Sequence, residues 1–176
     1  MKTKFKVLIA AVLFAGMGTG AFAQATTTAL NASATIVTAL TLTQNAALAF
    51  GNLSATTSTA VVLDALTPAN NANLNEGFAS GKMTVAGSGN LSILVTPAST
   101  ITLSDGDSHT MTVTLKTYGG GATDGTGAAV LTNGSTNEVD LVSGNYYLFV
   151  GGSIPTLSNQ TTGSYTGTAN FVVEYN

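Results

Sequence analysis

The chain has 176 residues and no cysteine, and only 7% of its residues are charged, against the roughly one quarter usual in soluble globular domains. Five Lys+Arg against eight Asp+Glu give a net charge of −3. So few cations cannot neutralise a row of phosphates, which excludes ordinary nucleic-acid binding, and without cysteine there is no disulfide, thiol nucleophile or cysteine metal cluster.

Residues 1–23 have the pattern of a secretory signal peptide. Three lysines at 2–6 precede an apolar run at 7–15, and an Ala-x-Ala cleavage site occupies 21–23. The apolar run is shorter than the ~20 residues needed to span a bilayer. We therefore predict export through the inner membrane to the periplasm, cell surface or extracellular space. The mature domain at 24–176 keeps two lysines and eight carboxylates, a charge of −6, and we expect no transmembrane segment in it.

Alternation of apolar and polar side chains predicts about ten short strands in the mature chain. Glycine, asparagine, aspartate and proline separate these strands at turns and loops. Residues 64–77 and the glycine-rich 119–127 are expected to be loops, Asp105-Gly106 the centre of a hairpin turn, and Gly151-Gly152 the end of a strand. In chain order, the expected strands are 32–43, 47–52, 59–63, 78–85, 91–95, 101–103, 111–115, 139–142, 146–150 and a closing strand from about Ser164.

This pattern predicts an all-β protein. No stretch after the signal peptide has sustained helical periodicity, and there is no internal repeat. Uneven loops and polar outer faces favour an immunoglobulin-like antiparallel β-sandwich over a barrel. We expect one such domain over residues 24–176.

The closing strand has the clearest alternation in the chain. Its odd positions from Tyr165 to Tyr175 are apolar, aromatic or glycine, whereas its even positions, apart from Val172, are polar. Packing in the core of a sandwich is a simpler interpretation of these aromatic side chains than a sugar-binding platform.

No motif in the sequence indicates catalysis, a cofactor or a metal. His109 is the only histidine, and we interpret it as an ordinary, partly exposed side chain beside a turn. Asp105 and Asp107 lack the spacing and the closing glutamate of a calcium loop. The glycine-rich stretch 119–127 lacks the Gly-Lys-Ser/Thr ending of a phosphate-binding loop. We therefore expect no enzyme activity, no cofactor and no metal.

Three stretches together resemble a family of small secreted bacterial proteins, domain of unknown function forty-four zero two (DUF4402). The most specific are "LAFGNL" at 48–53, "VGGSI" at 150–154 and "GSYTGTANFVVEYN" at 163–176. The resemblance covers nearly all of the mature chain. The resemblance informs the fold more than the role, because the function of this family is not established.

A looser likeness is to spore-coat-U-type and chaperone–usher pilus subunits, which are also secreted sandwiches ending on a strand with Gly-x-Tyr and a near-terminal Tyr. In those subunits the last strand borders a groove that a neighbour's N-terminal extension fills. The likeness implies a donor segment at 24–37, or the stretch 32–42 itself. Only eight residues, 24–31, precede the first expected strand, and the cysteine pair common in those subunits is absent. The candidate assembly residues are Ile36, Leu40, Leu42, Tyr165, Phe171, Val173 and Tyr175.

Two functional hypotheses follow. The first is a structural subunit of a surface appendage or matrix, partnered by itself head to tail or by other surface subunits. The alternative is a monomeric module that binds a glycan or another surface ligand through loops 64–77 and 119–138, with Tyr118 or Tyr146 as contacts. The two hypotheses differ in whether the 24–43 segment packs inside its own sandwich. A self-complemented domain favours the binding module, whereas a loose segment beside an unpaired edge favours assembly.

Overall fold

A computed structural model describes residues 26–176, so the predicted signal peptide at 1–23 lies outside the described residues. The chain divides into two units, residues 1–35 and residues 36–176. In the described part of the first unit, residues 26–35 form no helix or strand and are exposed. Across residues 26–176, no helix is both long and apolar enough to cross a membrane.

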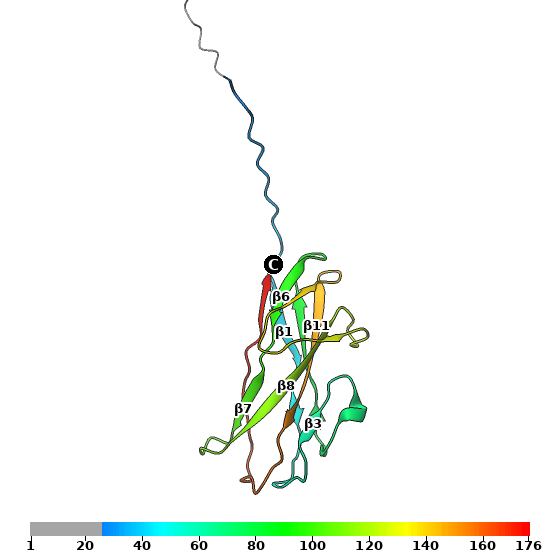
Figure 1. Cartoon of the computed structure of the whole chain (residues 1–176), viewed down its shortest axis with the longest axis vertical. Helices are drawn as coiled ribbons and strands as arrows, with labels where there is room; N and C mark the ends of the chain where they lie inside the picture. The colour runs from blue at the N-terminus through cyan, green and yellow to red at the C-terminus, as the bar shows by residue number, and fades with distance from the viewer. Residues whose placement is uncertain (1–25) are drawn as a thin grey trace, which may run out of the picture. The chain divides into compact units, whose positions relative to one another are not determined.

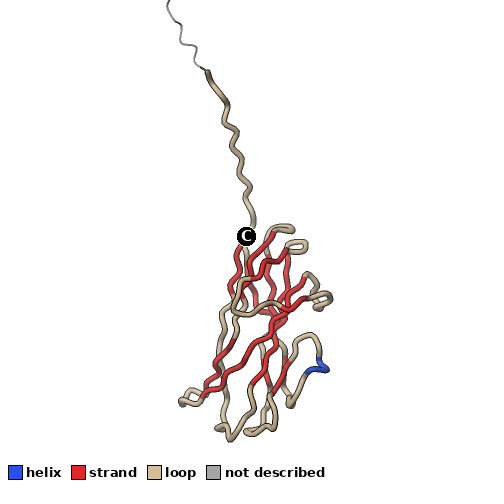
Figure 2. The backbone as a smooth tube through the Cα atoms, in the orientation of Figure 1, coloured by secondary structure: helices blue, strands red, loops and turns tan. Residues whose placement is uncertain are grey.

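The second unit is built almost entirely from β-strands (Figure 1). One short 3-10 helix, η1, interrupts them after β3 (Figure 2). The elements are β1 (Thr41–Ala46), β2 (Ala49–Phe50), β3 (Val61–Leu63), η1 (Pro68–Asn70), β4 (Phe78–Ala79), β5 (Gly81–Ala86), β6 (Ser92–Thr96), β7 (Thr100–Ser104), β8 (Thr110–Gly120), β9 (Ala129–Val130), β10 (Asn137–Asp140), β11 (Asn145–Ile154) and β12 (Val172–Tyr175).

The strands form antiparallel sheets. The largest has the order β1-β5-β11-β8-β7, with β3 also pairing β11 and β9 pairing β8. A three-stranded sheet has the order β10-β6-β12, and β2 pairs β4 separately. This sandwich-like arrangement confirms the all-β expectation. In the described part of the chain, no strand pairs with the outer edge of β1 or of β12.

Two clusters of buried apolar side chains form the core. One gathers residues of β5, β6 and the first half of β11, with Leu40, Leu42, Val173 and Tyr175 packed against it. We call it the upper core. The other, the lower core, gathers residues of β2, β3, β8 and the second half of β11. Alternation along the strands directs these side chains inward.

The expectation that Gly151-Gly152 ends a strand is wrong. β11 continues through both glycines to Ile154, pairing β8 on one edge and, on the other, first β5 and then β3. A Cβ on Gly151 would lie 2.1 Å from the carbonyl oxygen of Leu63, and one on Gly152 would lie 2.7 Å from that of Thr114. The glycines therefore permit close approach of neighbouring backbones.

The first strand is also shorter than the alternation at 32–43 predicted, because β1 begins at Thr41. Thr41 pairs with Ala86, the last residue of β5, and Gly87 then turns away to hydrogen bond Gly144. Residues 32–40 therefore have the side-chain pattern of a strand without a partner backbone.

Other strands also begin or end at residues different from those predicted, because each strand extends only as far as a partner backbone is present. Regular pairing of the closing segment is confined to β12, with one isolated bridge between Thr166 and Ser104 upstream. The expected strand 78–85 is divided into β4 and β5, and that at 139–142 is β10, two residues earlier. β8 runs on to Gly120, into the stretch expected to be a loop.

Replacing Gly151 by alanine is expected to lower the free energy of unfolding by about 2–3 kcal/mol. The added Cβ would meet the backbone of Leu63 and Ala65, which cannot move without breaking the β3–β11 ladder. Chemical denaturation measures the change. Gly163→Ala is the matched control, since the nearest atom there is 3.6 Å away. Equal denaturation midpoints for the two variants would contradict this account.

Candidate functional site

An open groove of about 1040 Å³ lies on one side of the lower core. One wall is residues 48–55, which follow β1, and the other is residues 160–167, which precede β12. The volume is slightly above the ~300–1,000 Å³ typical of small-molecule pockets. Glu76 is the charged residue that lines it. Its apolar floor and sides are formed by Leu48, Phe50, Leu53, Ile101, Leu103, Met111, Val113, Ile154 and Leu157.

The groove exists because the lower core is only partly covered. Phe50, Val113, Ile154 and Leu157 are buried members of that core. Ile101, Leu103 and Met111 pack against them but keep part of their surface exposed. Covering this water-exposed apolar surface with another apolar surface lowers the free energy of the system.

Each wall depends on a glycine that allows a close backbone approach. Gly51 has a φ of 71°, and a Cβ there would lie 2.4 Å from the carbonyl oxygen of Glu76. On the other wall, a Cβ on Gly167 would lie 2.3 Å from the carbonyl oxygen of Thr102 in β7. Both glycines belong to the motifs "LAFGNL" and "GSYTGTANFVVEYN".

Hydrogen bonds join the two walls at one end of the groove. The amide of Gln160 donates to the carbonyl of Ala55 (3.0 Å), and that of Thr57 donates to the carbonyl of Leu157 (3.0 Å). The Tyr165 hydroxyl accepts a hydrogen bond from the Gln160 side chain and donates to the carbonyl of Thr161. The chain on the two sides of the groove is thus tied together at this end.

The wall at 160–167 has backbone groups available toward the groove. Thr166 exchanges two hydrogen bonds with Ser104 of β7, at 2.8 and 2.9 Å. In an extended chain the neighbours of such a residue direct their N–H and C=O groups to the opposite side. Tyr165 and Gly167 therefore present theirs away from β7. Among the described residues, the backbone of 167–171 has no hydrogen-bond partner.

The predicted assembly residues lie in three places. Four of them, Leu40, Leu42, Val173 and Tyr175, pack against the upper core. Phe171 contacts both cores, and Tyr165 lines the groove. Ile36 is 97% exposed. The groove floor from β7 and β8 was missed, and the alternation of 101–103 and 111–115 was the only signal for it.

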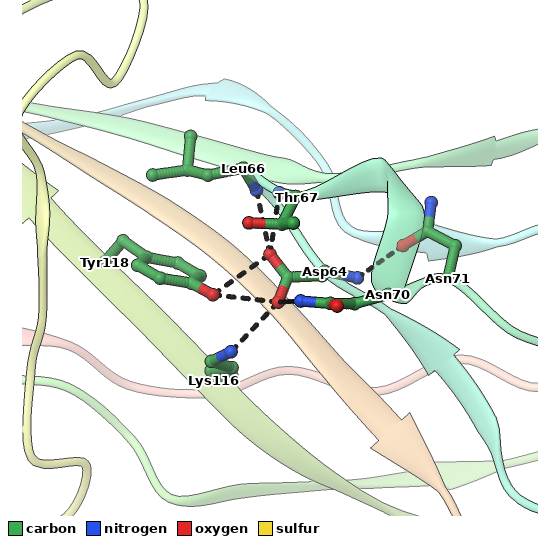
Figure 3. Close-up of polar contacts among 7 residues, drawn as sticks. All are labelled: Asp64, Leu66, Thr67, Asn70, Asn71, Lys116 and Tyr118. Atoms are coloured by element: carbon green, nitrogen blue, oxygen red, sulfur yellow. Dashed lines mark hydrogen bonds and ion pairs between the residues drawn. The ribbon is translucent and has the colours of Figure 1, made fainter.

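A second candidate site is the buried carboxylate of Asp64, in the stretch predicted to be a polar loop (Figure 3). Its side chain is 3% exposed and lies 2.9 Å from the ammonium of Lys116. The Tyr118 hydroxyl donates to both carboxylate oxygens, at 3.0 and 2.8 Å. The remaining donors are the Asn70 side chain and the amides of Leu66 and Thr67.

This arrangement makes Asp64 a structural group. Burial by itself raises the pKa of Asp64, but hydrogen bonds from Lys116, Tyr118, Asn70 and Thr67 outweigh burial and hold the pKa far below its usual range. A carboxylate that stays ionised and fully hydrogen bonded is a poor proton donor or acceptor near neutral pH. It joins the loop after β3 to β8 instead.

The other polar candidates also serve local structure. Asp105 accepts hydrogen bonds from the amides of Asp107 and His109 and lies 2.7 Å from the His109 ring, which fixes the β7–β8 turn. Within residues 26–176, no cluster of three or more His, Cys, Asp or Glu side chains is placed to hold a metal ion. Tyr118 and Tyr146, the contacts suggested for a glycan, are buried.

Acid is expected to destabilise the protein partly through Asp64. Its pKa is lower in the folded state than the ~3.9 of an unfolded chain, so its contribution is complete above about pH 4 to 5 and falls as the pH is lowered further. Asp64→Asn should unfold more easily at pH 7, by about 2–3 kcal/mol, and should show a shallower loss of stability between about pH 5 and pH 2.

Denaturation at a series of pH values measures both effects. Asp140→Asn, which changes an exposed carboxylate on β10, is the control expected to keep the wild-type slope. A wild-type slope in Asp64→Asn would show that Asp64 is not a source of the acid sensitivity.

A known protein family matches the part of the chain that contains the groove. The family described as "Domain of unknown function (DUF4402)" matches residues 40–175. No curated protein matches the chain. The matched region includes both walls and the floor of the groove and begins one residue before β1.

Proposed function

The chain belongs to the DUF4402 family, and on that premise we propose that it is a secreted, non-enzymatic structural subunit of a cell-surface appendage or extracellular matrix. Copies assemble by β-strand addition. An extended segment from a second copy enters the groove between residues 48–55 and 160–167. Backbone hydrogen bonds supply affinity in this mode of binding, and alternate side chains enter pockets.

The groove itself is the observation that carries this proposal. It has an apolar floor of core side chains and one wall with free backbone groups. An added strand needs both features, because its backbone must be paired and its inward side chains must be buried. The glycan alternative lacks comparable support, since Tyr118 and Tyr146 are buried.

The segment before β1 supplies a matching donor. Residues 26–39 contain no charged side chain, so none has to be desolvated in an apolar groove. Leu30 is 94% exposed and Ile36 is 97% exposed. Large apolar side chains left in water favour burial against a partner.

The outer strand edges are consistent with assembly. Monomeric β-proteins usually block exposed edges with lysine, proline or inward-pointing charges. β1, with the sequence TLTQNA, carries no charge and no proline, and β12, VVEY, carries one glutamate. Scarce surface charge also weakens the electrostatic barrier to self-association.

Deleting residues 26–36 tests the proposal while keeping the predicted cleavage site. The exported full-length protein is expected to form filaments in electron microscopy and a ladder of large species on gels run without boiling. The deletion variant should be monomeric, with the same circular dichroism spectrum and melting temperature, because it removes exposed residues. A full-length protein that stays monomeric, or a deletion variant that assembles equally well, would refute strand addition by this segment.

A further inference from the structure

We infer that residues 30–36 of one copy fill the groove of the next with their even-numbered side chains inward, and that copies therefore join head to tail in an open-ended chain. This inference rests on the proposed function. It adds which face of the donor is buried, and it excludes burial of Ile36 in the groove of its own molecule.

The choice of face follows from the donor sequence. One side of an extended chain carries Leu30, Ala32, Ala34 and Ile36, whereas the other carries Asn31, Ser33 and Thr35. Leu30 and Ile36 are six residues apart, about 20 Å at ~3.3 Å per residue. Only the even-numbered face can be buried over the groove floor without desolvating unpaired polar groups.

The end of the domain where this segment leaves is fixed by Tyr175. Its hydroxyl donates to the carbonyl of Thr38 (2.6 Å) and accepts from the amide of Ser88 (2.8 Å). Ser88 follows β5 by two residues, and Ala86 at the end of β5 pairs with Thr41. The hydrogen bond therefore holds Thr38 at the end of the sandwich where β1 starts.

The groove lies toward the other end. Asn145, the first residue of β11, is level with the start of β1, because Asn145 and Thr41 both pair with Ala86 of β5. Ile154 lies nine residues farther along β11, which is about 30 Å from Asn145. The first wall residue, Leu48, is already seven residues beyond the start of β1. Ile36 is two residues from Thr38 and reaches only about 7 Å from it. It cannot enter the groove of its own molecule.

In Figure 1 the turn that follows β11 lies at the end of the domain away from the C-terminus. A donor that leaves at one end and an acceptor near the other make a heterologous contact, in which two different surfaces meet. Such a contact leaves a free donor and a free groove on every dimer. Growth then continues as a filament unless the rotation between copies closes a ring.

The first test uses a synthetic peptide of residues 26–37 and the protein lacking residues 26–36. The unmodified peptide is expected to raise the melting temperature of this protein as its concentration increases. A peptide with Leu30→Asp and Ile36→Asp should give no shift. The matched control, Asn31→Asp with Thr35→Asp, adds the same charge to the other face and should retain the shift. Equal behaviour of the two charged peptides would overturn the assignment of the face.

The second test mixes full-length protein with copies lacking residues 26–36. A donor-less copy can accept a strand but cannot pass one on, so it should be found only at filament ends. With one donor-less copy in ten, filaments should shorten to about ten copies, as counted by electron microscopy with labelled donor-less protein. Labelled copies inside filaments of unchanged length, or no labelled copies at all, would overturn the head-to-tail contact.

These outcomes separate the two proposals. Absence of any filament from full-length protein counts against the proposed function. Filaments that persist in full-length Leu30→Asp/Ile36→Asp protein leave a structural role standing but refute the buried face. Circular dichroism of each variant confirms that the domain is folded before the comparison is made.

Discussion

Strand β11 is the constraint on which the rest of the sandwich depends. It is hydrogen bonded on both edges, and its partner on one edge changes from β5 to β3 at the two glycines. The change is possible because Gly151 and Gly152 have no side chain to meet the backbones of β3 and β8. β11 thereby extends to Ile154, which brings β3 and β8 into one lower core and forms part of the groove floor.

The two ends of that sandwich are closed differently. At the upper core, Leu40 and Leu42, from just before and within β1, and Val173 of β12 pack against the same buried cluster. In the lower core, the chain on each side of the gap runs as a wall without regular strand pairing across it, apart from three hydrogen bonds at one end. The described residues thus leave an apolar groove here, lined by residue types that favour a neutral, extended partner.

The buried ion pair has a different role from the groove. Lys116 is 45% exposed on its side chain while Asp64 is almost fully buried, so the carboxylate depends on protein donors in place of water. A buried charge of this kind is costly unless every oxygen is satisfied. Here the amides of the loop and the Tyr118 hydroxyl satisfy it, and the loop after β3 is held against β8.

The sequence by itself determined the all-β class and the apolar face of the closing segment. It did so because alternation records which side of a strand meets the core. Only the tertiary structure decided that β1 starts at Thr41, that β11 continues through two glycines, and that Asp64 is buried. Each depends on a partner distant in sequence, and side-chain periodicity contains no information about whether a neighbouring backbone is present. The groove is the clearest case, since its walls are about 110 residues apart in the sequence and its floor comes from strands between them.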